Sequence, residues 1–363
     1  MMYEKGLKGV IAAETRISYI DGQLGRLVYR GYDIQKLAAN YHFEEVAYLL
    51  WYGHFPNKEQ LFILKEELKK NRWLSDDLKS IISLLPPTMD LMSVIRTAVS
   101  AEGGYGEYQF PPTISQAVKL TALIPSIIAF RKRKLEGRAE VPPRNDLDHI
   151  ENYLYMLTGD IPTAAHVHAL EAYMILTLEH GMNASTFSAR VTISSESDIV
   201  SAVTSAIGTM KGPLHGGAPS GVLELLDEIS TVQDAAKVIR DKLIRGEKLM
   251  GFGHRVYKTH DPRAIALKEK LIKLGGQDKW LDLAMEVEES AITLLEEFKP
   301  GRALYTNVEF YAAAIMKAIQ LEPILFTPTF TASRIVGWTA HILEQASDNV
   351  IYRPQSKYVG SFF

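Results

Sequence analysis

The chain has 363 residues, 47% hydrophobic and 23% charged, which is enough apolar material for two hydrophobic cores and typical of a globular protein in water. Its 40 basic and 43 acidic residues give a formal net charge of -3, so no general electrostatic attraction favours nucleic acid or anionic membranes. Because the chain has no cysteine, disulfides, thiolate nucleophiles and cysteine-ligated metal sites are excluded.

The N-terminal residues 1–6 carry charge and lack the apolar stretch and small-residue cleavage pattern of a secretory signal. We therefore expect a cytoplasmic protein. The most apolar segments, such as residues 120–130 and 335–343, are shorter than the roughly 20 residues that a membrane-spanning helix requires. Membrane insertion is not expected.

Residues 17–20 and 27–29 alternate in polarity around Asp21, Gly22 and Gly25, a pattern that predicts one short β-hairpin. From Glu44 onward, apolar residues recur at helical spacing, and most of the remaining chain is predicted to be helical. Turns rich in glycine and proline divide this material into helices of ordinary length, at residues 53–56, 85–87, 141–143 and 158–162. The predicted fold class is all-α with a small N-terminal β-hairpin.

Residues that break helices also indicate how the chain divides. A glycine-rich loop at residues 211–219 and the pair Glu322-Pro323 bound an interval that contains several amphipathic helices. We expect a large helical domain from residues 1–210 and 323–363, and a smaller helical domain at residues 211–322. Because active sites often lie in clefts between domains, both edges of the smaller domain should line the site.

Three further patterns do not support the functions that they first suggest. The segment Gly251-Phe-Gly253 lacks the third glycine and the preceding strand of a dinucleotide-binding loop. The basic run at residues 131–134 follows an apolar stretch, and we interpret it as the solvated end of a helix rather than a nucleic-acid signal. His166 and His168 are two residues apart, so on a helix they point in different directions and no metal site is predicted.

The first segment that could carry chemistry is Lys211-Gly-Pro-Leu-His-Gly-Gly217. Small or rigid residues surround His215, which exposes backbone donors and allows a ligand to approach closely. By itself the segment is equally compatible with a plain loop between two helices.

A second histidine flanked by glycine, His254, lies in Gly251-Phe-Gly-His-Arg-Val-Tyr-Lys258. Two cations, Arg255 and Lys258, follow it and are suited to a phosphate-rich ligand, and Arg263 comes soon after in Asp-Pro-Arg. The alternative is a loop at a helix start that carries surface charges. Two such loops in one chain favour a functional site.

A carboxylate with aromatic and apolar neighbours, Glu309, lies in the segment at residues 305–311. Burial there would raise its affinity for a proton and make it a useful base. The alternative, an ordinary acid in the first turn of a helix that begins at Asn307, is the more common role. His180, Arg334 and Arg353 are each compatible with structural roles, but together the arginines supply the cations that a dicarboxylic 2-oxo acid requires.

Taken in order, the segments Gly-Pro-Leu-His-Gly-Gly, Gly-Phe-Gly-His-Arg-Val-Tyr, Asp-Pro-Arg and Asn-Val-Glu-Phe-Tyr closely resemble the citrate synthase family in its short bacterial and archaeal form. The resemblance runs from the hairpin to Arg353-Pro354. It implies an almost entirely helical homodimer whose smaller domain closes over the substrates. The implied reaction joins acetyl-CoA, oxaloacetate and water to give citrate and CoA, with no metal and no cofactor besides the CoA thioester substrate.

The resemblance also implies roles for individual residues. Glu309 would remove a proton from the acetyl methyl group, His215 would hydrogen-bond the thioester oxygen, and His254 would protonate the oxaloacetate carbonyl. The residues implied to hold oxaloacetate are His180, Arg263, Arg334 and, in the neighbouring subunit's site, Arg353. Those implied to contact CoA are Leu214, Gly251, Phe252, Gly253, Arg255, Val256 and Lys258.

One residue departs from the family pattern, because the family's usual base is aspartate and this chain has Glu309. The added methylene moves the carboxylate by roughly 1.5 Å, and a misplacement of about 1 Å can cost ~100-fold in rate. We expect a compensated but less efficient enzyme. Two alternatives stay open, a 2-methylcitrate synthase that uses propionyl-CoA and a weakly active paralogue that binds CoA or oxaloacetate for regulation.

Overall fold

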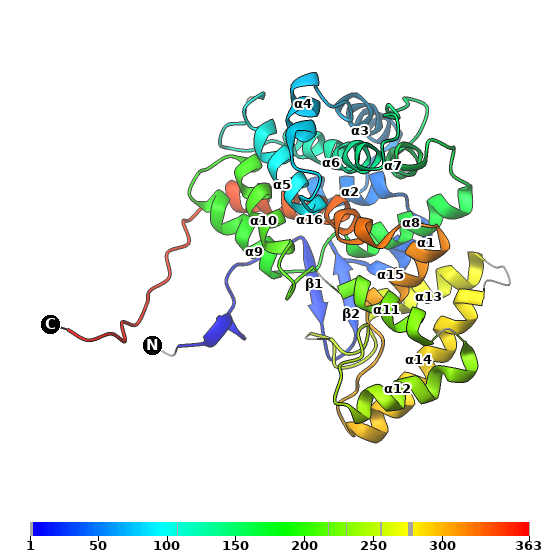
Figure 1. The fold of residues 1–363 in the computed structure, drawn as a ribbon. Helices are drawn as coiled ribbons and strands as arrows, with labels where there is room; N and C mark the ends of the chain where they lie inside the picture. Colours follow the sequence, from blue (N-terminus) through cyan, green and yellow to red (C-terminus); the bar gives the residue numbers. More distant parts are fainter. Residues whose placement is uncertain are drawn as a thin grey trace.

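The computed structural model describes residues 3–106, 108–216, 218–229, 231–254, 256–274 and 279–362. Helices make up most of it, which confirms the predicted all-α class (Figure 1). The helices of the first 210 residues are α1 (Ile34–Asn40), α2 (Phe43–Tyr52), α3 (Lys58–Asn71), α4 (Asp76–Leu84), α5 (Leu91–Glu102), α6 (Ile114–Leu135), α7 (His149–Thr158), α8 (Ala164–Thr177), α9 (Ala184–Ser194) and α10 (Ile199–Met210). The later helices are α11 (Ala218–Ile229), α12 (Ala235–Ile244), α13 (Pro262–Leu274), α14 (Lys279–Phe298), α15 (Val308–Ala318) and α16 (Phe326–Ser347). Short 3₁₀ turns are η1 (Lys5–Leu7), η2 (Val232–Asp234) and η3 (Pro323–Leu325).

The predicted hairpin is present as antiparallel strands β1 (Ser18–Asp21) and β2 (Arg26–Tyr29). A third strand that we did not expect, β3 (Tyr32–Asp33), pairs with β2 to complete a small sheet. It is only two residues long, so no alternating pattern announces it. The chain reverses between β2 and β3 through two residues with positive φ, Arg30 at 48° and Gly31 at 89°.

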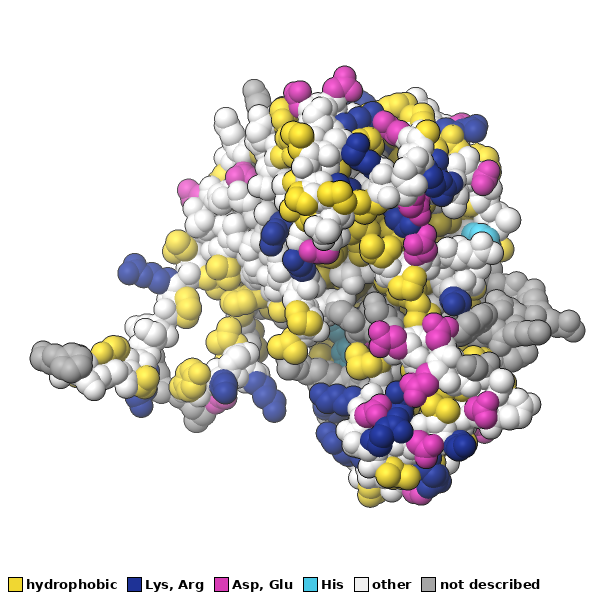
Figure 2. All heavy atoms as spheres, in the orientation of Figure 1, with side chains coloured by type: hydrophobic (Ala, Val, Ile, Leu, Met, Phe, Trp, Pro, Cys, Tyr) yellow, Lys and Arg dark blue, Asp and Glu magenta, His cyan; other side chains and the backbone are white. Residues whose placement is uncertain are grey.

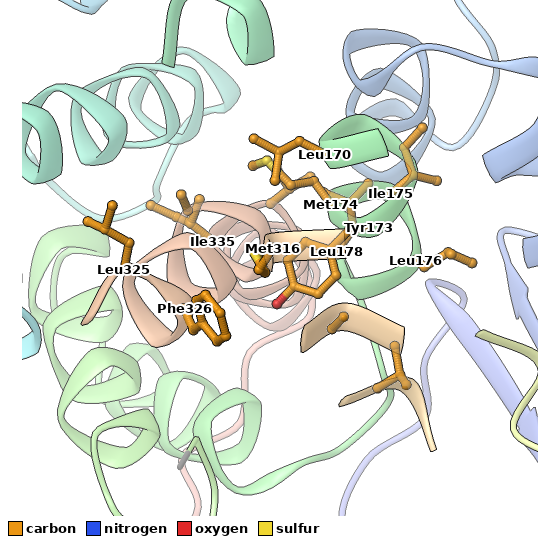
Figure 3. Close-up of a cluster of buried hydrophobic side chains, with 14 of the residues drawn as sticks. Leu170, Tyr173, Met174, Ile175, Leu176, Leu178, Met316, Leu325, Phe326 and Ile335 are labelled. Carbon is orange, nitrogen blue, oxygen red and sulfur yellow. The ribbon is translucent and has the colours of Figure 1, made fainter. Parts of the chain in front are cut away.

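Helices α12, α13 and α14 lie together at the lower end of the molecule, while α2 to α10 and α16 form the larger upper mass (Figure 1). The two groups meet around α8, α15 and α16. Figure 3 shows Tyr173 and Met174 of α8 in one buried cluster with Met316 of α15 and with Phe326 and Ile335 of α16. This apolar contact packs α15 against α8 and α16. The division into domains at residues 211 and 322 stays a prediction.

The basic run after the apolar stretch of α6 is not solvated as we expected, because Arg131, Lys132 and Arg133 are all buried. Arg131 donates from Nη1 to the carbonyl oxygens of Ile82 and Leu85 at 3.2 and 3.1 Å. These guanidinium groups satisfy carbonyls at the ends of neighbouring helices, which periodicity cannot reveal. By length and composition α6 could cross a bilayer, but most of its apolar window is buried by the surrounding helices.

The two ends of the chain leave the body of the molecule as extended segments (Figure 1). The C-terminal segment follows α16 and is largely exposed, including the apolar side chains of Val350, Ile351 and Val359. Arg353 lies on this segment and is exposed.

Candidate active site

The glycine loop before His254 is paired with the segment before α15. Phe252 and Thr306 form an antiparallel bridge, and the N–H of Gly253 donates to the carbonyl oxygen of Tyr305 at 2.7 Å. Both Gly251 and Gly253 have positive φ, 88° and 80°, a conformation that a residue with a Cβ adopts only with strain. The two segments are therefore one structural unit, and it sets His254 beside the start of α15.

His254 is held in one tautomer by the backbone that follows it. Its Nδ1 accepts from the N–H groups of Val256 and Tyr257 at 3.0 and 3.2 Å, so the proton of the neutral ring lies on Nε2. Burial lowers the pKa of His254 to about 4, and the charge of Arg263 adds to the effect. At neutral pH the ring is uncharged and offers an N–H at Nε2, which lies 3.4 Å from Nη2 of Arg263.

His180 follows the end of α8 and is buried beside this histidine. Its Nε2 lies 3.1 Å from the hydroxyl of Tyr257, and its ring centroid is 5.4 Å from that of His254. Burial, reinforced by the charges of Arg263 and Arg334, lowers the pKa of His180 well below its usual value. His180 is therefore a neutral hydrogen-bonding group.

Asp261 joins the starts of α13 and α15. Its carboxylate accepts from Nε and Nη2 of Arg263 at 3.0 and 2.8 Å and from the N–H of Val308 at 3.1 Å. Burial opposes ionisation of Asp261, but the charge and hydrogen bonds of Arg263 outweigh it and hold the pKa of Asp261 below its usual value. Sequence reasoning noted the Asp-Pro-Arg motif but gave Asp261 no role.

Glu309 occupies the first turn of α15, where Asn307 caps the helix by accepting from the N–H of Glu309 at 3.0 Å. Burial raises the pKa of Glu309 to about 7, while Arg263 acts to lower it and Asp261 to raise it. No residue that the structure describes donates a hydrogen bond to its carboxylate. Glu309 is thus a carboxyl group that exchanges a proton near neutral pH, as a general base requires.

His215 lies in the turn after α10, and its Nε2 is 2.7 Å from the hydroxyl oxygen of Ser185. That oxygen also accepts from Nε1 of Trp338 at 3.0 Å. Burial lowers the pKa of His215 to about 4, with a contribution from Arg334. No sequence pattern predicts this partnership, because Ser185 and Trp338 are distant from His215 along the chain.

Arg334 is buried on α16 and donates from Nε to the carbonyl oxygen of Thr177 at 2.6 Å. Its guanidinium lies over the ring of Phe330, 4.7 Å from the centroid. Within the described residues no carboxylate lies within ion-pair distance of it. A buried cation without a paired anion is costly, which favours binding of an anionic ligand at this position.

The described residues that are predicted to contact CoA lie on two loops, whereas Arg353 lies apart from the rest of the site. Leu214 is fully exposed in the turn that carries His215, and Val256 is partly exposed in the loop after His254. The N–H of Lys258 donates to the carbonyl oxygen of Gly22 at 2.8 Å, which places this loop against the hairpin turn. Arg255 lies outside the described residues. The structure does not bring Arg353 to the other site residues, because it lies on the extended C-terminal segment.

No group of three or more His, Asp or Glu side chains among the described residues is arranged to hold a metal ion. On the face seen in Figure 2, Lys and Arg side chains are interspersed with Asp and Glu. Of the two buried arginines of the site, Arg334 is the one without a close carboxylate in the described part of the chain, because Asp261 pairs with Arg263.

Known proteins that are similar in sequence and structure show which family the chain belongs to. The model of the citrate synthase C-terminal domain matches residues 6–355. The chain belongs to the citrate synthase family. A citrate synthase of Haloferax volcanii is 40% identical, with 98% of this chain and 96% of the relative covered.

A 2-methylcitrate synthase of Mycobacterium tuberculosis is also 40% identical, over 98% of this chain and 90% of the relative. Among solved structures, the citrate synthase of Thermoplasma acidophilum in a ternary complex with carboxymethyl coenzyme A and oxaloacetate superimposes with a TM-score of 0.89. It is 30% identical, over 100% of this chain and 97% of that one. The family expected from the ordered motifs is therefore confirmed.

Proposed function

We propose that the chain condenses acetyl-CoA with oxaloacetate and water to give citrate and CoA. The observation that carries this proposal is the backbone pairing that sets the start of α15, with Glu309, beside the loop of His254. Burial raises the pKa of Glu309 to about 7. A base of this strength is matched to removing a proton from carbon next to a thioester carbonyl near neutral pH. We assign the hydrogen bonds that the reaction needs to two neutral histidines, His215 and His254.

The first step forms a carbon nucleophile. Glu309 takes a proton from the acetyl methyl group, and the electron pair of that C–H bond moves toward the thioester oxygen. We assign the hydrogen bond to this oxygen to Nδ1 of His215, which carries a proton when the hydroxyl of Ser185 donates to Nε2 at 2.7 Å instead of to Oδ1 of Asn183 at 2.8 Å. A neutral donor of this kind stabilises the negative charge that develops on the enolate oxygen.

The second step forms the carbon–carbon bond. The enolate carbon attacks the keto carbon of oxaloacetate, and the keto oxygen takes a proton from Nε2 of His254. The backbone bonds to Nδ1 keep this proton on Nε2. Water then attacks the thioester carbonyl, which breaks the C–S bond and releases CoA as the thiol with citrate as the acid.

Oxaloacetate carries two negative charges, and the described site in one chain has one buried cation without a close carboxylate, Arg334. The charge of Arg263 is already balanced by Asp261 at 2.8 Å. A further cation is needed, and we assign it to Arg353 of a second copy in a homodimer, as the family resemblance implies. The extended C-terminal segment supports this assignment, because it leaves the body of its own chain (Figure 1).

We assign the binding of oxaloacetate to His180, Arg263 and Arg334. We assign the binding of CoA to the turn that carries His215 and to the loop that carries His254. Residues 211–322 are proposed to close over both ligands. The proposed CoA contacts are Leu214, Gly251, Phe252, Gly253, Arg255, Val256 and Lys258. The ternary complex of the Thermoplasma acidophilum relative with a CoA derivative and oxaloacetate supports these two ligands. A cytoplasmic location belongs to the same proposal.

The test is CoA release by the purified protein supplied with acetyl-CoA and oxaloacetate, with the acid product identified by mass spectrometry. We expect CoA release that requires oxaloacetate and yields citrate. Binding of both ligands without CoA release from acetyl-CoA or propionyl-CoA would instead support the regulatory paralogue.

A 2-methylcitrate synthase is the second candidate, because the Mycobacterium tuberculosis relative with that activity is as similar as the Haloferax volcanii citrate synthase. The two substrates differ by one methylene, which is worth about 1–3 kcal/mol, or roughly 10- to 200-fold in kcat/KM. Measuring kcat/KM for acetyl-CoA and propionyl-CoA on the same preparation decides between them. We expect acetyl-CoA to be preferred.

A further inference from the structure

Glu288 on α14 is a buried carboxylate with side-chain partners on three other segments of the chain. It accepts from Nζ of Lys268 on α13 and from the hydroxyl of Tyr311 on α15, both at 2.5 Å. It also accepts a short hydrogen bond from the hydroxyl of Thr306. Each of these segments carries a residue of the candidate active site.

Thr306 is the centre of the backbone pairing between the two catalytic loops. It forms the bridge with Phe252, and its neighbour Asn307 donates from its N–H to the carbonyl oxygen of Gly251 at 2.9 Å. Asn307 also caps the helix that begins with Val308 and Glu309. A displacement of Thr306 therefore moves the His254 loop and the first turn of α15 together.

The other two partners of Glu288 lie on the helices that carry Glu309 and Arg263. Tyr311 is two residues after Glu309 on α15, and Lys268 lies one turn beyond Arg263 on α13. We propose that Glu288 is a positioning residue that sets the placement of Glu309, His254 and Arg263 for the reaction. This inference rests on the proposed condensation. It adds a residue that affects the reaction through its hydrogen-bond partners and not through contact with a substrate.

An ionised carboxylate suits this role, because hydrogen bonds to a charged acceptor are about twice as strong as neutral ones. Burial acts to raise the pKa of Glu288, but Lys268, Thr306 and Tyr311 outweigh it and lower the pKa below its usual value. The carboxylate accepts from three donors at once. An amide in its place presents an NH₂ group to at least one of those donors, and that contact becomes repulsive.

The test compares Glu288→Gln with Glu289→Gln, the adjacent residue on α14, which is exposed. We expect Glu288→Gln to lower kcat by about 10- to 100-fold, since a displacement of about 1 Å at a reacting group costs on that order. KM for acetyl-CoA should change by less than about threefold, whereas KM for oxaloacetate should rise, because Arg263 is displaced together with Lys268 on α13. Glu289→Gln should match the wild type.

A second readout separates positioning from a simple loss of folded enzyme. If proton removal by Glu309 is slowed, the isotope effect on kcat with trideuterated acetyl-CoA rises in Glu288→Gln. A smaller fraction of folded molecules lowers kcat and leaves the isotope effect unchanged. Equal kcat in Glu288→Gln and Glu289→Gln, or a lower kcat with an unchanged isotope effect, overturns the proposal. A wild-type protein that releases no CoA contradicts the proposed condensation instead.

Should Glu288→Gln fail to fold, the pair Thr306→Val and Thr306→Ser carries the same test. Valine has the shape of threonine without the hydroxyl, and serine keeps the donor to Glu288. We expect Thr306→Val to lower kcat and raise the isotope effect, and Thr306→Ser to recover most of the activity. Similar values in the two variants overturn the proposal.

Discussion

The side-chain amide of Asn307 donates to the carbonyl oxygen of Gly253 at 3.0 Å. One residue thus ties the start of α15, which carries Glu309, to the loop that carries His254. The proposed base and the proposed proton donor stand on a shared backbone frame, although they are far apart in sequence. Their relative placement is set by hydrogen bonds rather than by long, flexible side chains, so conservative substitutions in this frame are informative.

Replacing Glu309 by Gln should lower kcat by roughly 10²- to 10⁴-fold, the usual contribution of a general base. Gln keeps the size of the side chain and removes its ability to take a proton. Glu309→Asp keeps the carboxylate and should retain turnover well above that of the Gln variant. Steady-state CoA release with acetyl-CoA measures both, and wild-type kcat in Glu309→Gln would exclude the residue as base.

The pH dependence of kcat/KM follows from the same carboxyl group. Burial raises the pKa of Glu309 to about 7, and the base acts only when ionised, so kcat/KM should rise through pH 7 and level off above it. Burial lowers the pKa values of His215 and His254 to about 4, so both rings stay neutral over this range. A rise completed below about pH 5 would contradict the assignment.

The motifs of the site could be predicted because each lies in a short, contiguous segment with glycines or a helix start around it. The family was therefore predicted correctly, and His215, His254 and Glu309 could be proposed as site residues. Contacts between distant segments could not be predicted. Ser185 reaches His215 and Glu288 reaches Thr306 only because helices pack side by side, and no spacing in the sequence encodes that.

The same limit explains the errors in the fold. The buried cations after residue 130 appear solvated in sequence because their partners, such as the carbonyl oxygen of Ile82, are distant along the chain. Strand β3 has only two residues, too few to show the alternation of apolar and polar side chains that predicts a strand. Helical spacing did predict that most of the chain is helical, and several helices begin at ordinary caps, as at Asn57, whose side chain accepts from the N–H of Gln60 at 2.8 Å.

Replacing Ser185 by Ala should lower kcat by about tenfold and also reduce stability. The change removes the partner of His215 Nε2 and leaves Nε1 of Trp338 buried without an acceptor, which costs about 1–3 kcal/mol. Ser195→Ala, at the exposed end of α9, serves as the matched control. Steady-state kinetics and thermal unfolding measure the two effects, and a kcat equal to that of the control would remove Ser185 from the site.

Two glycines of similar conformation allow a test of whether the hairpin turn supports the site. Gly25 and Gly31 both have positive φ, so alanine strains the backbone at either position by roughly 1–2 kcal/mol. A Cβ on Gly25 would lie 2.7 Å from the carbonyl oxygen of His260, whereas one on Gly31 meets nothing within 4 Å.

Gly25→Ala therefore pushes on the backbone just before Asp261, and Gly31→Ala does not. We expect Gly25→Ala to lower kcat/KM several-fold more than Gly31→Ala, although both lower the melting temperature. Kinetics and thermal unfolding of the two variants side by side test this. Equal losses of kcat/KM would show that the hairpin turn does not support the site.

Whether Arg353 acts in the site of a second copy can be tested by mixing two inactive variants. Arg353→Ala keeps His254, and His254→Ala keeps Arg353, so a mixed dimer has one complete site only if Arg353 crosses between subunits. Co-expression at equal levels should give about a quarter of the wild-type activity, since half of randomly paired dimers are mixed and each has one working site. If Arg353 served its own chain, every site would lack one of the two residues and the mixture would stay as inactive as its parents.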